Sequence, residues 1–139
     1  MNRFVISCLG LMLFGFGAGA QAESVKKETT DALNGARMTY EYSSGRAYDV
    51  KLEQAGASYR YLTGSKPDKW WGPFPYQAMQ VEGKRYFLSW FEKEYGDFVT
   101  LLVDFEKKLI HGSALIQGKN VHFHRARITE FRLPDPAGE

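Results

Sequence analysis

Residues 38–52 read Met-Thr-Tyr-Glu-Tyr-Ser-Ser-Gly-Arg-Ala-Tyr-Asp-Val-Lys-Leu, and this stretch decides the fold class. Its first arm alternates with a period of two, which places Met38, Tyr40 and Tyr42 on one face of a β-strand. A Ser-Ser-Gly-Arg turn follows, and the second arm repeats the alternation from Tyr48 onward. The stretch therefore predicts two antiparallel strands joined by a tight turn.

The same alternation continues through most of the chain. It predicts strands at residues 38–42, 47–54, 58–63, 76–82, 85–92, 98–105, 109–117 and 121–133. Residues 64–75 contain three prolines and two glycines and are predicted to form one long loop. Short strands at this regular spacing are typical of an antiparallel barrel or sandwich. We expect an all-β domain of about eight or nine strands over residues 37–133.

The N-terminal segment predicts export. Arg3 precedes an apolar run over residues 4–16, and Ala20-Gln21-Ala22 matches the small-x-small pattern of a signal-peptidase site. Residues 1–22 are therefore interpreted as a signal peptide cleaved after Ala22, with a periplasmic or secreted product and no membrane attachment after cleavage. A retained N-terminal anchor is the alternative. Residues 23–36 are predicted to be a polar segment, and residues 134–139 a tail.

The composition and the motifs of the chain exclude several classes of function. The 139 residues carry 18 basic and 16 acidic side chains, a formal charge of +2, which gives no electrostatic case for a nucleic-acid partner. The single cysteine, Cys8, excludes an intrachain disulfide and lies within the predicted signal peptide. No P-loop, dinucleotide fingerprint or Ser-His-Asp arrangement occurs. A small-molecule ligand is the expected partner, and a homodimer is an expected alternative to a monomer.

Polar residues on apolar strand faces are the candidate site. Trp90 and Glu92 share a face of one strand, so an inward orientation would bury the carboxyl and raise its pKa toward that of a useful proton donor. The alternative places Glu92 beyond the strand end, in water. Tyr40 and Tyr42 could present two O–H donors to a carboxylate or phenolate, or they could be core tyrosines with bonded hydroxyls. Tyr48 carries the same two interpretations.

Two further groups are candidates. Lys69, Trp70 and Trp71 lie in the predicted loop, where the tryptophans could cover an aromatic ligand with Lys69 as its charge partner, or could pin the loop to the barrel. His111, His122 and His124 are the histidines of the chain, and three imidazoles could bind a metal ion. No acidic residue is placed to complete that set, so the histidines are expected to be solvent-facing or hydrogen-bonded. No metal and no cofactor are predicted.

Several of these segments resemble the phenolic acid decarboxylases. The pattern Tyr40-x-Tyr42-x-x-Gly45-x-x-Tyr48 resembles their first hairpin, and residues 59–64, 86–92 and 107–112 resemble later segments in the same order. The resemblance extends over residues 33–116. The MoaF-like proteins share this layout, and both groups are calycin-type barrels related in shape to lipocalins, which implies the same fold here.

The resemblance also implies roles. Tyr40 and Tyr42 match the substrate-binding tyrosine pair, Tyr48 matches a third pocket tyrosine, and Glu92 matches the catalytic glutamate. The implied reaction needs no cofactor: protonated Glu92 would donate to the alkene carbon of a 4-hydroxycinnamate, and the resulting quinone methide would lose carbon dioxide. Tyr40, Tyr42 and Lys69 would orient the substrate and neutralise its charge.

Three departures from that family shift the expectation. Lys69 stands before Trp70 where the decarboxylases carry Arg, and a lysine offers a point charge in place of a planar fork. The chain also goes almost directly to its last strand, without the family's helical stretch, and it carries a signal peptide. We therefore expect an exported MoaF-like barrel that binds a small, aromatic or phenolic ligand. A hydroxycinnamate decarboxylase is the alternative, and Trp70 and Trp90 are expected to contact the ligand in either case.

Overall fold

The computed structural model describes residues 28–135, so the predicted signal peptide and most of the predicted tail lie outside the described residues. Nine strands make up the structure. They are β1 (Ala36–Tyr42), β2 (Ala47–Glu53), β3 (Gly56–Tyr61), β4 (Trp70–Phe74), β5 (Tyr76–Glu82), β6 (Arg85–Glu92), β7 (Asp97–Asp104), β8 (Leu109–Ile116) and β9 (Asn120–Arg132).

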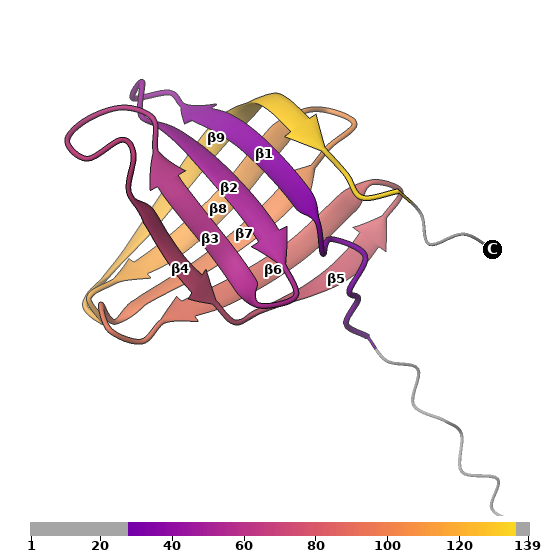
Figure 1. Ribbon diagram of the computed structural model, residues 1–139, viewed down its shortest axis with the longest axis horizontal. Helices are drawn as coiled ribbons and strands as arrows, with labels where there is room; N and C mark the ends of the chain where they lie inside the picture. The colour runs from indigo at the N-terminus through magenta and orange to yellow at the C-terminus, as the bar shows by residue number, and fades with distance from the viewer. Residues whose placement is uncertain (1–27, 136–139) are drawn as a thin grey trace, which may run out of the picture.

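The strands form one antiparallel sheet that curls into a nearly closed barrel (Figure 1). The order is β4-β3-β2-β1-β9-β8-β7-β6-β5, so β4 and β5 are the two edges. Edge strand β4 lies against β6 and covers the seam. Within residues 28–135 there is no helix, and hence none that could cross a membrane. The prediction of a small, all-β, calycin-type antiparallel barrel is confirmed.

Most strand predictions are confirmed, and one loop prediction is wrong. The strands predicted at residues 76–82 and 85–92 occur at those residues. The predicted loop over residues 64–75 instead contains β4, which includes Gly72 and Pro73. These two residues indicated a loop because proline cannot donate to a sheet ladder, but an edge strand needs no donor on its open side. Strand β4 pairs with β3 through Tyr59 opposite Trp71 and Arg60 opposite Trp70.

An aliphatic core fills one end of the barrel. The largest side chains with almost no exposure include Leu33, Met38, Leu88, Leu101 and Ile110. Leu33 lies in the predicted polar segment, yet it is fully buried, and the nearby Thr30 amide donates to the carbonyl of Ala78 on β5. Residues 30–35 therefore form part of the barrel and close this end.

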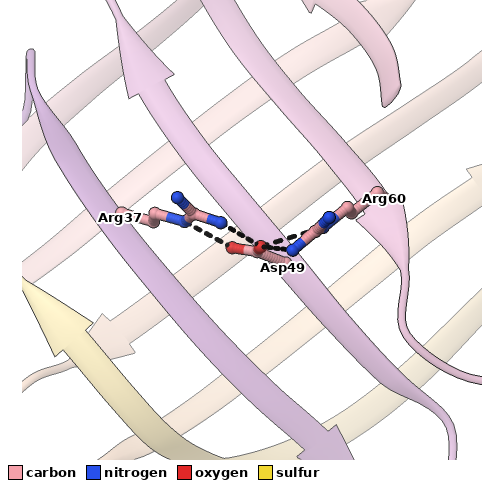
Figure 2. A network of polar contacts seen from close by, with 3 residues as sticks. All are labelled: Arg37, Asp49 and Arg60. Carbon is pink, nitrogen blue, oxygen red and sulfur yellow. Dashed lines mark hydrogen bonds and ion pairs between the residues drawn. The ribbon is translucent and has the colours of Figure 1, made fainter. Parts of the chain in front are cut away.

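Charged side chains cover the outer face of β1–β3. Asp49 on β2 accepts hydrogen bonds from Arg37 Nε on β1 at 2.9 Å and from Arg60 Nε on β3 at 3.0 Å (Figure 2). The two guanidinium groups hold the pKa of Asp49 below its ordinary value, against the effect of burial. Trp70 lies beneath these cations, with Lys51 Nζ 4.7 Å from its ring centroid. The network ties three neighbouring strands together.

Asp49→Ala is expected to lower the free energy of unfolding by about 2 kcal/mol at pH 7. Breaking a buried pair costs about 3–5 kcal/mol, and the estimate is reduced because both arginines reach water. Because the pKa of Asp49 is lowered in the fold, the contribution is present above its ordinary pKa of about 3.9 and is lost as the pH falls through the folded value. Urea titrations at pH 7 and pH 3 measure both effects.

Glu53→Ala is the matched control, since the Lys51–Glu53 pair is long at 3.8 Å and exposed on both sides. It should change the stability by less than about 0.5 kcal/mol. Equal losses in the two variants would show that the Asp49 network contributes no more than a surface ion pair.

Candidate functional site

The other end of the barrel is lined by aromatic and polar side chains. On β1 the inward residues change from Met38 to Tyr40 and Tyr42, and on β6 they change from Leu88 to Trp90 and Glu92. The result is a cavity of about 790 Å³ that opens at the end where the β1–β2, β6–β7 and β8–β9 turns gather (Figure 1, left). Strands β1 and β6 thus contribute aliphatic residues to the core and aromatic or polar ones to the cavity.

Glu92 is the buried acid of this cavity. It is only 2% exposed and its two oxygens have separate donors. Trp90 Nε1 donates to Oε1 at 3.0 Å, and the Tyr59 hydroxyl donates to Oε2 at 3.0 Å. Burial raises the pKa of Glu92, although both hydrogen bonds act in the opposite direction. Glu92 therefore keeps its proton to a higher pH than an exposed glutamate does, and it lies in the pocket rather than in water.

Tyrosines form a continuous wall beside Glu92. Tyr40 stacks on Tyr48 with ring centroids 5.7 Å apart, and Tyr42 meets both rings edge-on at 5.5 and 5.3 Å. Tyr61 extends the wall from β3, with its ring 5.0 Å from that of Tyr48 and 5.9 Å from that of Tyr59. Perpendicular and offset rings at these separations are favourable arrangements for aromatic pairs.

Four phenols of this wall, those of Tyr40, Tyr42, Tyr48 and Tyr59, are neutral donors at physiological pH. Burial raises the pKa of Tyr40 well above its ordinary value and raises the pKa of Tyr42 to about 12. The pKa of Tyr59 is raised by burial and by the charge of Glu92. The pKa of Tyr48 is raised mainly by burial, while the nearby Arg46 acts against that effect. Several O–H groups thus face one space, as anion recognition requires.

Basic and imidazole groups lie at the rim of the cavity. Arg46 in the β1–β2 turn and Arg125 on β9 both line it, together with His122 and His124. His124 meets Tyr42 edge-on at 4.8 Å, and burial lowers its pKa, so the ring is neutral at pH 7. Its Nε2 atom is buried without a hydrogen-bond partner in the structure. A bound ligand could supply that partner.

The structure brings five of the predicted site residues together and leaves two outside. Those lining the cavity are Tyr40, Tyr42, Tyr48, Trp90 and Glu92. Trp70 lies on the outer face under Arg37, and Lys69 is exposed with its Nζ 3.6 Å from the Trp71 ring centroid. Because β4 is a strand, its neighbouring tryptophans point to opposite faces, and it is Trp71 that reaches the mouth.

Trp71 borders a second opening that shares a wall with the main cavity. This opening measures about 540 Å³ and lies between β4 and the β6–β7 turn, and both spaces are lined by Tyr59, Tyr61, Glu92 and Asp97. Trp71 meets Tyr95 of that turn edge-on at 5.4 Å, across the barrel seam. Its Nε1 atom is also buried without a partner in the structure.

The histidines do not converge. His122 and His124 share the inner face of β9, whereas His111 lies on the outer face of β8, opposite Leu102 and Arg125. Within residues 28–135, no three His, Cys, Asp or Glu side chains are grouped to hold a metal ion. The three-imidazole arrangement considered from the sequence is therefore not formed.

Sequence reasoning missed several cavity residues. Tyr59 and Tyr61 alternate on β3 and could have been found from their period of two. Trp71 was a candidate together with Trp70, but the loop prediction gave no basis for choosing which of the two faces the mouth. Arg46 follows a turn glycine, where no periodicity applies. His124 was predicted to lie in the last strand, but the sequence did not show whether its side chain faces the cavity.

Comparisons with known proteins extend only to the fold. No model of a protein family matches the chain, and no curated protein does. Among solved structures, one described as "Crystal Structure of a putative beta-lactamase from Burkholderia vietnamiensis" is similar with a TM-score of 0.60. It is 16% identical, and the match covers 73% of this chain and 95% of that one. At this identity the likeness concerns the barrel alone.

Proposed function

We propose that this chain is an exported, MoaF-like β-barrel that binds a small aromatic ligand with an acidic group, such as a phenolic acid. The observation that carries the proposal is the placement of Glu92, held by Trp90 and Tyr59, in the same open cavity as the tyrosine wall. A cavity of about 790 Å³ lies within the usual range for small-molecule sites.

The chemistry of the lining supports this ligand class. Aromatic walls from Tyr40, Tyr48 and Trp90 suit a flat ring, and the neutral phenols offer donors to a carboxylate or a phenolate. Arg46 at the rim supplies a positive charge, which was expected from Lys69. A ligand would therefore place its ring between the tyrosines and its acidic group toward Arg46.

A hydroxycinnamate decarboxylase is the second candidate, and the raised pKa of Glu92 favours it. In that reaction Glu92 would donate its proton to the alkene carbon of the substrate. The substrate, ionised at its phenol, would become a quinone methide; the electron pair of the bond to its carboxyl carbon would then re-form the alkene and restore the aromatic phenolate as carbon dioxide departs. Tyr40 and Tyr42 would hold the anionic group during this step. Both candidates use the same cavity, and turnover separates them.

Phenolic acids are expected to quench the fluorescence of Trp90, and Tyr42→Phe should weaken their binding about fivefold. The loss corresponds to one neutral hydrogen bond of about 1 kcal/mol. Titration with p-coumarate and ferulate measures the affinity, and loss of the cinnamate absorbance reports turnover. Trp70→Phe removes the outer-face tryptophan, so that its emission does not dominate the signal.

Tyr95→Phe is the matched control because Tyr95 borders the second opening and not the main cavity. It should leave the affinity unchanged. If no phenolic acid in the panel quenches the fluorescence, the proposed ligand class is wrong. If Tyr42→Phe and Tyr95→Phe weaken the binding equally, the ligand does not lie in the main cavity.

A further inference from the structure

The outer face of β5–β9 carries a cluster of exposed apolar side chains, with Arg125 at the groove between them, in contrast to the charged outer face of β1–β3. Several large hydrophobic side chains on it are exposed, led by Phe123 at 85% and Val121 at 62%. Others are Met79 on β5, Phe87 and Phe91 on β6, and Phe98 on β7, at 37–48%. We call this surface, with its neighbours Leu102 and Leu115, the apolar face.

The register of the strands arranges the large side chains of the apolar face in two rows, which we call ridges. One ridge crosses four strands as Phe91, Phe98, Leu115 and Val121, which are paired in sequence across the sheet. A second ridge crosses the sheet as the paired residues Met79, Phe87, Leu102 and His111, and Arg125 continues this row on β9.

Between the ridges runs a trough floored by small hydroxyl residues. Its floor is the cross-strand row Ser89, Thr100 and Ser113, and a groove of about 500 Å³ lies over Thr100 and Ser113. Phe123 continues this same row on β9 and stands at the end of the trough. Ser89 and Thr100 bond each other at 3.1 Å, so these two hydroxyls are already paired and can be covered without losing a partner.

We propose that the apolar face is the interface of a symmetric dimer, in which Phe123 of each copy lies in the trough of the other. A projecting ring beside a groove can be self-complementary, as an interface between identical surfaces related by a twofold axis requires. Two sheet faces of this kind pack as in a β-sandwich, about 10 Å apart.

The size of the face fits a second copy. At roughly 200 Å² for a whole aromatic side chain, the four phenylalanines alone expose on the order of 400 Å². This is about half of the roughly 800 Å² that each partner buries in a stable complex, and the aliphatic ridge residues add to it. An apolar patch of this size is comparable to the largest patch of a typical monomer, and such patches are often functional. The contact is made by side chains on the sheet face and does not use the open backbone edges of β4 and β5.

Sedimentation velocity of the purified protein, from about 1 µM to about 100 µM, tests the proposal. We expect a dimer in the wild type and at least a tenfold increase in its dissociation constant for Phe123→Asp, because a buried aromatic anchor would become a charge. Ser113→Arg should have the same effect by filling the trough floor without removing any apolar group. Both sites are on the surface, and circular dichroism checks that the barrel remains folded.

Leu62→Asp is the matched control, since Leu62 is an exposed apolar residue at the β3–β4 connection, away from the apolar face. It should leave the dissociation constant unchanged. A wild type that stays monomeric throughout would overturn the proposal and leave the face to a different kind of partner. A dimer unaffected by both Phe123→Asp and Ser113→Arg would overturn it as well, by placing the contact on another surface.

Discussion

Glu92→Gln is expected to reduce any conversion of p-coumarate at least 100-fold while its affinity stays within about threefold. A glutamine keeps the size of the protonated acid: its oxygen can accept from Trp90 Nε1, and its amide can donate to the Tyr59 oxygen. It cannot deliver a proton, and general acids contribute about 10²–10⁴-fold to rate. Stopped-flow absorbance and fluorescence titration of the same preparations give the two quantities.

The same substitution should change how stability depends on pH. Because burial raises the pKa of Glu92 in the fold, the folded state binds this proton more tightly than the unfolded chain. Wild-type stability is therefore lost relative to Glu92→Gln as the pH rises from about 4.3 through the raised folded value, and the difference is constant above it. Urea titrations between pH 4 and pH 8 measure this difference.

Glu94→Gln provides the control for both measurements. Glu94 is an exposed carboxylate two residues away that borders only the second opening. It should leave turnover, affinity and the pH profile as in the wild type. Turnover that survives Glu92→Gln would remove Glu92 from the role of acid. If the stability of the wild type and that of Glu92→Gln depend on pH in the same way, the burial of Glu92 does not destabilise its charged form.

The barrel could be predicted from the sequence because its strands face two different environments. Residues such as Tyr86 and Leu88 point into the barrel while Phe87 points outward. Alternation of this kind predicts both that the segment is a strand and which of its side chains face the core. The failure occurred at β4, where five residues with a glycine and a proline give no clean alternation. An edge strand pairs on one side only, so local composition does not reveal it.

The site was predictable only as far as it follows from alternation within one strand. Tyr40 and Tyr42, or Trp90 and Glu92, share a face whatever the sheet does, and the structure places all four on the cavity. Tyr59 on β3 is brought to Glu92 on β6 by the curvature of the barrel, across the seam where β4 lies against β6. No pattern within one strand contains that contact, because it depends on how the sheet closes.

For the apolar face, the sequence predicts which residues point outward but not how they are arranged. The alternation assigns Phe91 and Phe98 to the outer surface, and a sequence alone offers no reason for an aromatic residue there. Only the register, which sets these rings in a row beside a trough of small residues, gives the pattern a shape. The two outer surfaces of the barrel differ in chemistry, as the proposed dimer contact on one of them requires.

Gly56→Ala is expected to destabilise the barrel by about 3 kcal/mol or more. Gly56 begins β3 with a φ of +140°, and a Cβ atom there would lie 2.4 Å from the carbonyl oxygen of Phe74 on β4. Backbone on both sides leaves no flexible group that could move aside. The strain of a left-handed φ is about 1–3 kcal/mol by itself, and separating β3 from β4 adds to it. Thermal and urea denaturation measure the loss.

Gly64→Ala separates the two causes, because Gly64 also has a left-handed φ, +90°, but nothing within 4 Å of the added atom. It should cost only the backbone strain, about 1 kcal/mol, and the excess in Gly56→Ala measures the contact between strands. Equal losses would show that β4 adapts to the added methyl group. If β4 detaches in part, Trp71 leaves the mouth, and the seam beside Glu92 opens to water. Ligand affinity should then fall in Gly56→Ala and not in Gly64→Ala, which would link the close packing of an edge strand to the chemistry of the cavity.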